Sequence, residues 1–351
     1  QKLPESVHTL CTSNTEIFFH NLAPKNRRKT IGITGTKGKS MTAKFAYELL
    51  GNCDFKVALA GNYGSGLLDH LDHMDELDYL IMELSSFQLA HLDRSVHIAM
   101  CTNLYEDHID WHGSVENYHG DKSHLWKYQT ESDFLLVPYR YCDRPEFETR
   151  GTRHTCGSMY HQFFPEEGCI WHAEHYLHNF GLVYQLYRMF ELPEPLMKKT
   201  AQELKALPHR MYHVKTVKGI EFYDNVIATN PHATIADIKF LKNRLGTLIL
   251  GGSDRGNDFK TIFAAMRRNH VRAHIIIEDS ESAPLIKKAL EEFPHLEFSE
   301  VKNMEEAVKI GFEKTPKDKV CLLSPACASW DRYGGYPEKG EKFIECVKKL
   351  K

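Results

Sequence analysis

The segment from Thr30 to Ser40 restricts the possible folds more than any other part of this 351-residue sequence. Its first five residues are mostly β-branched and predict a short strand, and the next six contain two glycines and end in Gly38-Lys39-Ser40. Good helix formers follow from Met41 to Leu50 with helical spacing. Strand, glycine loop and helix make half of a βαβ unit, so the sequence predicts an α/β fold with a mainly parallel sheet.

The glycine loop has the composition of a phosphate-binding site. Glycines let backbone N–H groups face a phosphate, and the following helix adds its positive N-terminus. Lys39 would then reach the β- and γ-phosphates of a nucleotide, and the Ser40 hydroxyl would bind Mg²⁺. The strict P-loop pattern has a glycine five residues before Gly38, where this chain has Ile33. We therefore expect a variant P-loop rather than a chance glycine turn.

Acidic residues follow two further predicted strands. Glu83 comes directly after the strand Tyr79–Met82, where a carboxylate beside a P-loop is well placed to bind Mg²⁺. A surface or helix-capping glutamate is the alternative. The run from Asn103 to His112 follows the strand at 98–102 and concentrates acids and histidines. Because Mg²⁺ prefers oxygen ligands, the residues alone leave a ligand site and a solvated loop equally open there.

Small residues end two strands in the second half of the chain. Ser324–Asp331 would let a ligand approach the backbone, and Gly251–Gly256 would present Arg255 to a carboxylate. Plain strand-to-helix turns are the alternative for both loops.

Leu207-Pro208-His209-Arg210 separates two α/β alternations. We expect a central P-loop ATPase domain at 30–207 and a C-terminal Rossmann-like domain at 208–351. Residues 140–172, rich in turn formers, aromatics and histidine, are expected to form a small β insertion. The chain begins with Gln1 and shows no opening strand, so residues 1–29 are interpreted as the remnant of an N-terminal domain with its linker.

Composition narrows the class of protein further. A hydrophobic fraction of 42%, a charged fraction of 26% and a net charge of −3 predict a globular protein without a broad attraction to nucleic acid or membrane. No apolar run is long enough to span a bilayer, so no membrane insertion is expected. The nine cysteines form no C-x-x-C pair and no zinc spacing, which favours a reducing, cytoplasmic setting.

Taken in order, these motifs resemble the Mur ligase family, and within it the branch that adds D-glutamate. The matching segments are Thr34–Ser40 (the family's TGTNGKS loop), Gly61-Asn62 (GN), Glu83–Leu89 (ELSSFQL), Asn103–Asp110 (N-x-x-E-D-H-x-D), Leu207–Arg210 (the L-x-H-R hinge) and Ser324–Ser329 (SPACAS). The resemblance runs from about residue 4 to the end of the chain, and the expected N-terminal remnant would belong to the domain that holds uridine diphosphate.

The resemblance implies a reaction and its residues. ATP would phosphorylate the carboxylate of UDP-N-acetylmuramoyl-L-alanine, and the amine of D-glutamate would attack the acyl phosphate, a step in peptidoglycan precursor synthesis. The catalytic residues implied are Lys39, Glu83, His108 and Lys122; the nucleotide contacts are Gly35, Thr36, Lys37, Gly38, Lys39, Ser40, Asn179, Arg210 and Asp224; the substrate contacts are Asn62, Thr229, Arg255, Ser329, Trp330 and Tyr336; and the Mg²⁺ ligands are Ser40, Glu83, His108 and a carbamylated Lys122. A monomer is expected.

Several positions depart from the family pattern. The DSKATN segment reads Asn225-Val226-Ile227-Ala228-Thr229-Asn230 here, so its aspartate and lysine are lost, and Asp224 would serve at the ribose only after a register shift. Arg255 stands where lysine is usual and would still pair with a carboxylate. These departures keep two alternatives open, a nucleotide-binding module without ligase activity and another amino-acid ligase of the superfamily, such as the folate polyglutamate type.

Overall fold

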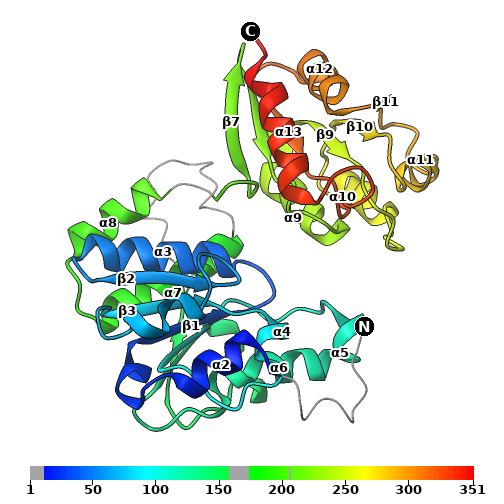
Figure 1. Ribbon diagram of the computed structural model, residues 1–351. Coiled ribbons are helices and arrows are strands. Elements are labelled where there is room, and N and C mark those ends of the chain that lie inside the picture. Colours follow the sequence, from blue (N-terminus) through cyan, green and yellow to red (C-terminus); the bar gives the residue numbers. More distant parts are fainter. Residues whose placement is uncertain (1–11, 158–173, 205–206) are drawn as a thin grey trace. The chain divides into compact units, whose positions relative to one another are not determined.

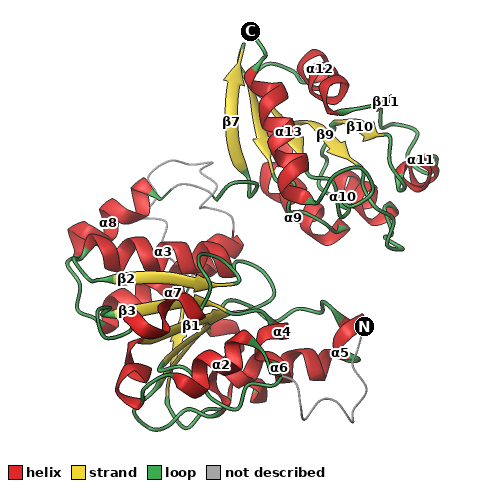
Figure 2. Ribbon diagram, in the orientation of Figure 1, coloured by secondary structure: helices red, strands yellow, loops and turns green. Residues whose placement is uncertain are grey.

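The computed structural model describes residues 12–157, 174–204 and 207–351, and the chain divides into two compact units, residues 1–204 and 205–351. Each unit contains a six-stranded sheet with helices packed around it (Figure 1, Figure 2). The predicted α/β class, with a mainly parallel sheet followed by a second α/β unit, is confirmed. The boundaries drawn from the sequence at 29 and 207 stay predictions.

The first sheet has the strand order β2-β3-β1-β4-β5-β6, and every neighbouring pair is parallel. Its strands are β1 (Thr30–Thr34), β2 (Val57–Gly61), β3 (Tyr79–Glu83), β4 (Ile98–Cys101), β5 (Phe134–Pro138) and β6 (Thr152–Cys156). Because the strands run the same way, the residues after β1, β3 and β4 lie at one edge of the sheet. The central strands are buried on both faces and are therefore almost entirely apolar.

Among the described residues, the helices of the first unit are α2 (Asn14–Asn21), α3 (Lys39–Asn52), α4 (Ser86–Leu89), α5 (Ile109–His112), α6 (Val115–Lys127), α7 (Glu174–Met189) and α8 (Glu194–Glu203), with 3₁₀ turns at Pro24–Lys29, Leu68–His73, Tyr139–Tyr141 and Pro145–Phe147. α3 and α8 lie along one side of the sheet, and α2 and α6 along the other (Figure 1). Phe18 from α2 and Trp126 from α6 belong to the core on that second side, so helices far apart in sequence close one apolar layer.

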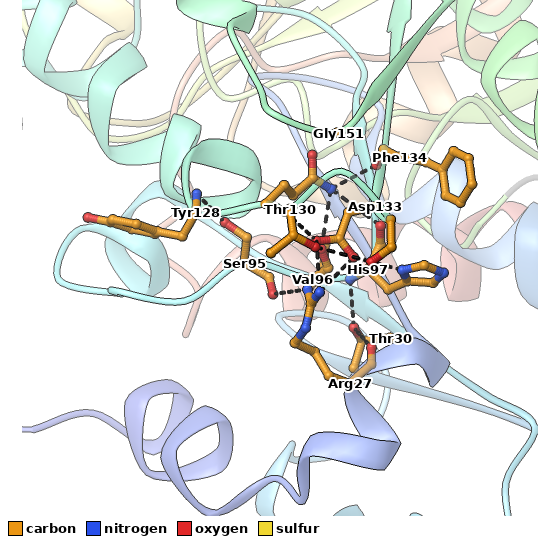
Figure 3. Close-up of polar contacts among 12 residues, drawn as sticks. Arg27, Thr30, Ser95, Val96, His97, Tyr128, Thr130, Asp133, Phe134 and Gly151 are labelled. Carbon is orange, nitrogen blue, oxygen red and sulfur yellow. Dashed lines mark hydrogen bonds and ion pairs between the residues drawn. The ribbon is translucent and has the colours of Figure 1, made fainter.

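A polar network fixes the amino ends of three strands (Figure 3). Both oxygens of the fully buried Asp133 accept from the Arg27 guanidinium at 2.7 Å, and Oδ1 also accepts from His97 Nδ1 at 2.8 Å. The Thr130 N–H donates to the same carboxylate at 2.7 Å, and the His97 N–H donates to Thr30 Oγ1 at 3.0 Å. Hydrogen bonds from Arg27 and His97 lower the pKa of Asp133 despite its burial. The starts of β1, β4 and β5 are thereby held in register, away from the glycine-loop edge.

The second sheet has the strand order β11-β10-β9-β12-β8-β7, and only β7 runs antiparallel to its neighbour. Its strands are β7 (Tyr212–Val217), β8 (Ile220–Asp224), β9 (Leu245–Leu250), β10 (His274–Glu278), β11 (Phe298–Val301) and β12 (Val320–Leu323). The helices are α9 (Pro231–Leu241), α10 (Lys260–Arg268), α11 (Ala283–Leu290), α12 (Met304–Lys314) and α13 (Tyr336–Lys348), with a 3₁₀ turn at Lys242–Arg244. In both units, no helix of the described part is long and apolar enough to cross a membrane.

One expectation about the fold is wrong. The first part of the 140–172 region does not form a separate β insertion, because β6 pairs in parallel with β5 and becomes the edge strand of the main sheet. Residues 158–173 of that prediction lie outside the described residues. The first four residues of β6 are polar and at least partly exposed, which hid this edge strand from a search for apolar runs.

Candidate active site

Two glycines shape the loop between β1 and α3. Gly35 and Gly38 have φ values of +138° and +87°, which favour glycine. A Cβ atom at Gly35 would lie 2.1 Å from Thr102 Oγ1, so the loop lies directly against the residues that follow β4. No described side chain caps the start of α3, and the positive end of this helix faces the glycine loop that precedes it. This geometry is that of a phosphate-binding loop.

Asn103 fastens the loop, although sequence reasoning treated it only as the start of a motif. Its Oδ1 accepts from the Lys37 N–H at 2.8 Å, and its Nδ2 donates to the Lys37 carbonyl at 2.8 Å. Thr102 Oγ1 donates to the same carbonyl at 2.6 Å, and the Thr36 N–H donates to the Asn103 carbonyl. The sequence feature that indicates this role of Asn103 is its position as a polar residue near the end of a buried strand.

Two lysines meet at one backbone carbonyl beside the loop. Lys39 Nζ donates to the Gly35 carbonyl at 2.9 Å, and Lys122 Nζ, from α6, donates to the same oxygen at 3.0 Å. Lys122 is 1% exposed, and burial followed by the charge of Lys39 lowers its pKa to about 7. Lys122 can therefore hold a neutral amine near neutral pH, which is the form that reacts with carbon dioxide.

Glu83 ends β3 at the same edge of the sheet. It is 1% exposed; its Oε1 accepts from Asn62 Nδ2 at 3.1 Å, while Oε2 has no hydrogen-bond partner among the described residues. Asn62 follows β2, so this contact joins two neighbouring strand ends. A buried carboxylate oxygen without a donor is costly unless a cation or a ligand satisfies it.

His108 lies on the loop that follows β4. Its backbone has φ +54°, a left-handed conformation that is uncommon outside glycine. Its imidazole lies 5.0 Å from the Phe87 ring, between ring centroids, and its side chain is half exposed. Lys37, on the glycine loop, forms an ion pair with the neighbouring Asp107 at 3.2 Å.

These residues fit a magnesium site without forming a complete one. Within the described ranges, no group of three or more His, Cys, Asp or Glu side chains could hold a metal ion by itself. The unsatisfied Glu83 Oε2 nevertheless fits a hard cation, and the hydroxyl of Ser40 lies in the first turn of α3. A carbamate on Lys122 would supply the further oxygen ligands that the protein side chains lack.

Asn179, on α7, lies against the glycine loop. It is 4% exposed, and neither its Nδ2 nor its Oδ1 has a hydrogen-bond partner in the described part of the chain. A Cβ atom at Gly38 would lie 2.1 Å from Asn179 Nδ2. An unsatisfied buried amide against a phosphate-binding loop is consistent with the nucleotide contact expected for Asn179.

In the second unit, the two small-residue loops are joined to each other. The Gly251 N–H donates to the Pro325 carbonyl at 3.1 Å, and the Ser253 N–H donates to the Ala328 carbonyl at 2.7 Å. Ser329 is fully buried, and its Oγ has no hydrogen-bond partner in the described residues. Two further expected substrate residues, Arg255 and Trp330, lie on these loops, and Tyr336 is the first residue of α13. Thr229 precedes α9 in the same unit.

Sequence reasoning missed the buried ion pair below these loops. Lys339 Nζ lies 2.6 Å from Glu278 Oε2, and both side chains are 1% exposed. Lys339 also donates to the Gly251 carbonyl at 2.7 Å, and the Tyr333 hydroxyl donates to Glu278 Oε1. Burial and the charge of Glu278 raise the pKa of Tyr333. One lysine among many in a charged terminal helix gives no sequence signal for such a role.

Asp224 and Arg210 lie near the start of the second unit. Asp224 is fully buried and accepts from His209 Nδ1 at 2.6 Å and from the Val226 N–H at 2.9 Å. Both of its carboxylate oxygens therefore already have protein donors. Its hydrogen bond raises the pKa of His209, which holds a left-handed φ of +64°. The structure thus gives Asp224 a role in fixing the turn beside Arg210.

Comparison with known proteins supports one family over both units. Residues 33–187 match the Mur ligase middle domain, and residues 209–327 match the Mur ligase glutamate ligase domain. The UDP-N-acetylmuramoylalanine–D-glutamate ligase of Bacillus subtilis is 31% identical over 344 residues, which cover 92% of this chain and 75% of that protein. The chain belongs to the Mur ligase family. The enzyme of the same name from Streptococcus thermophilus is 30% identical, with 92% of this chain and 74% of that protein covered.

Solved structures show the fold of this Mur ligase at lower identity. The MurF ligase of Thermotoga maritima in complex with ADP matches with a TM-score of 0.67 and 17% identity, covering 99% of this chain and 85% of that one. A bifunctional folylpolyglutamate synthase/dihydrofolate synthase from Yersinia pestis matches with a TM-score of 0.64 and 14% identity, covering 92% and 93%. The resemblance found in the sequence motifs is therefore confirmed at the level of the family.

Proposed function

We propose that this Mur ligase joins D-glutamate to UDP-N-acetylmuramoyl-L-alanine with hydrolysis of ATP to ADP and phosphate. The observation that carries the proposal is the arrangement of Lys39, Lys122 and Glu83 around the glycine loop, which combines a phosphate-binding site with a buried reactive amine and an unsatisfied carboxylate. The names of the relatives with about 30% identity supply the substrates.

The reaction begins with phosphoryl transfer. The carboxylate of the muramoyl-alanine substrate attacks the γ-phosphorus of ATP, ADP leaves, and an acyl phosphate forms. The loop N–H groups and the ammonium group of Lys39 hold the phosphates and offset their charge. Mg²⁺, held by Ser40, Glu83, His108 and a carbamate on Lys122, would neutralise further charge on the transferred group.

The carbamate forms on Lys122 without a further cofactor. The ammonium group first loses one proton. The neutral amine then adds to carbon dioxide and loses a second proton, so that an anionic oxygen ligand replaces a buried cation. The lowered pKa of Lys122 supports this step, because an amine that was always protonated would not react. The ammonium group of Lys39 repels a protonated Lys122, whereas it would attract the negative carbamate.

Amide formation completes the cycle. The amine of D-glutamate attacks the acyl carbon, phosphate leaves, and the amine loses its proton. We assign the carboxylates of D-glutamate to Arg255, Thr229, Ser329 and Tyr336, with Trp330 beside them, and we assign Asn62 to the nucleotide-sugar substrate. The buried Ser329 hydroxyl supports this assignment, since a bound carboxylate would accept a hydrogen bond from this O–H group, which lacks a partner among the described residues. We further propose a cytoplasmic enzyme that acts as a monomer.

Phosphate release tests the function directly. With ATP, Mg²⁺ and both substrates, we expect release that stops when either substrate is omitted and that is lost in Lys39→Ala. ATP binding without phosphate release would instead support the non-catalytic alternative, which the segment Asn225-Val226-Ile227 motivates. Release with a folate substrate and L-glutamate, but not with the muramoyl substrate, would favour the folate-type ligase.

A further inference from the structure

A chain of hydrogen bonds joins three elements behind the proposed metal site. Asp121 Oδ2, on α6, lies 2.5 Å from His112 Nδ1, on α5. The other ring nitrogen of His112, Nε2, lies 3.0 Å from Ser86 Oγ, at the start of α4. The His112 side chain is completely buried, and the residue Ser86 is 2% exposed. Three segments that are separate in sequence thus meet at one imidazole.

The order Ser–His–Asp is also that of a nucleophilic triad, and burial decides against this reading. A nucleophilic serine must meet a substrate carbonyl, whereas Ser86 lies inside the protein. When Nδ1 carries the ring proton and donates to the Asp121 carboxylate, Nε2 accepts from the Ser86 hydroxyl. Each group is satisfied, so the chain fits a fixed support.

Each of the three segments carries one proposed ligand of Mg²⁺. Ser86 follows Glu83 by three residues, His112 follows His108 by four, and Asp121 directly precedes Lys122. A shift of α4 or α6 relative to α5 would therefore displace a ligand. The Asn117 side chain adds to the link by donating from Nδ2 to the His112 carbonyl at 3.0 Å.

The packing around His112 also reaches His108. The Phe87 and Tyr118 rings lie 5.4 and 5.1 Å from the His112 ring, between centroids, and the same two rings lie 5.0 and 6.2 Å from the His108 ring. His108 is held in its left-handed backbone conformation between these aromatic neighbours. A change at His112 would disturb the packing of Phe87 and Tyr118, the two rings that also lie against the His108 imidazole.

We propose that Ser86, His112 and Asp121 are positioning residues that hold Glu83, His108 and Lys122 in the geometry that binds the divalent cation. This inference rests on the proposed metal site. The three residues touch neither metal nor substrate, and they act by joining α4, α5 and α6. Partners behind the ligands of a metal site commonly change metal affinity 10- to 100-fold when they are removed.

Binding of Mn²⁺ by the full chain in bicarbonate buffer, followed by the loss of the free-ion signal in electron paramagnetic resonance, tests this role without activity. We expect Ser86→Ala and His112→Asn to bind Mn²⁺ about 10-fold more weakly than the wild type. Asp121→Asn keeps an oxygen that can accept from His112 Nδ1, so its affinity should stay within about twofold of the wild type.

His124→Asn is the matched control. His124 also joins α6 to α4, because its Nδ1 lies 2.8 Å from the Leu89 carbonyl, but none of its hydrogen bonds among the described residues reaches α5, the helix that follows His108. We expect wild-type Mn²⁺ affinity in this variant, even if its unfolding temperature falls as much as that of His112→Asn. Equal weakening in His124→Asn and His112→Asn would show a general packing effect and overturn the inference.

Glu83→Gln separates the two proposals. If this variant loses Mn²⁺ binding while Ser86→Ala and His112→Asn keep the wild-type affinity, the metal site stands and the positioning role is wrong. If Glu83→Gln binds Mn²⁺ as tightly as the wild type, the metal site itself is wrong, and the positioning role is wrong with it.

Discussion

Lys122 combines complete burial with a hydrogen bond to a carbonyl that a second lysine shares. Two ammonium groups at one oxygen repel each other, and the strain is relieved when one amine becomes neutral or acquires a negative group. The residue is therefore poised for covalent modification rather than for a permanent positive charge.

We predict a carbamate on Lys122. Protein equilibrated with ¹³C-labelled bicarbonate should give a carbamate signal in ¹³C NMR, and Lys122→Met should lack it. Lys127, an exposed lysine at the end of the same helix, supplies the control, since Lys127→Met should leave the signal unchanged. A signal of equal size in Lys122→Met would assign the modification to another amine.

Asp237 gives a second residue-scale prediction. Burial raises its pKa to about 7, although Asn225 and Ser324 donate to its Oδ2 at 2.6 and 2.8 Å. The unfolded chain releases this proton near pH 4, so the free energy of unfolding falls as pH rises from about 4 to 7. Asp237→Asn should therefore be more stable than the wild type at pH 8, by on the order of 2 kcal/mol, and the advantage should shrink towards pH 5.

Urea unfolding at pH 5 and pH 8 measures this difference. Asp279→Asn, at an exposed carboxylate, should change stability by less than about 0.5 kcal/mol at either pH. A stability gain in Asp237→Asn that did not depend on pH would contradict the assignment.

Sequence alone identified most of the proposed site but not its supports. Gly35–Ser40 and Glu83 lie in short motifs whose chemistry can be read locally, whereas the roles of His108 and Lys122 are implied only by the family resemblance. The roles of Asn103, His112 and Lys339 depend on partners between 9 and 88 residues away. No spacing rule encodes such contacts, because the fold alone brings these residues together.

At the scale of elements, apolar runs predicted the buried central strands well. β1 has the predicted bounds, and β3 and β4 each differ from the prediction by one residue at the end of the strand. The edge strands β2, β7 and β11 were missed: β7 and β11 carry polar residues, and the apolar β2 is only partly buried. The helix expected from Met41 to Leu50 is α3, which begins two residues earlier and ends two residues later.

The pair Glu278–Lys339 ties β10 to α13 and yields a prediction at this scale. Lys339→Met would leave the Glu278 carboxylate buried without its cation, and we expect it to destabilise the second unit by roughly 3 kcal/mol. The double variant Glu278→Gln/Lys339→Met should recover much of this loss, because no buried charge then remains unpaired. Chemical denaturation followed by circular dichroism measures both.

Lys342 on the same helix provides the comparison. It pairs with Glu305 at 2.6 Å, but both side chains are well exposed, so Lys342→Met should cost less than about 1 kcal/mol. Equal losses in Lys339→Met and Lys342→Met would show that burial does not determine the contribution of the pair.

At the scale of the whole molecule, each unit has its own sheet and its own apolar core. Phe222, Ile249 and Phe343 belong to a core built only from the second unit. We therefore predict that residues 207–351 fold when expressed alone, with one cooperative thermal transition and dispersed amide signals in NMR. A broad, non-cooperative transition would show that this unit depends on the remainder of the chain.

The close approach of Gly38 and Asn179 also has an evolutionary consequence. A methyl group at position 38 would collide with the Asn179 amide, and the φ of +87° would strain it even if Asn179 were smaller. Substitution of Gly38 is thus opposed by two separate effects, the clash with Asn179 and the backbone strain. Substitution of Asn179 is opposed only where the new side chain would contact Gly38. Descendants of this chain should therefore preserve the glycine longer than the asparagine, because the backbone conformation restricts position 38 even when the side-chain contact has changed.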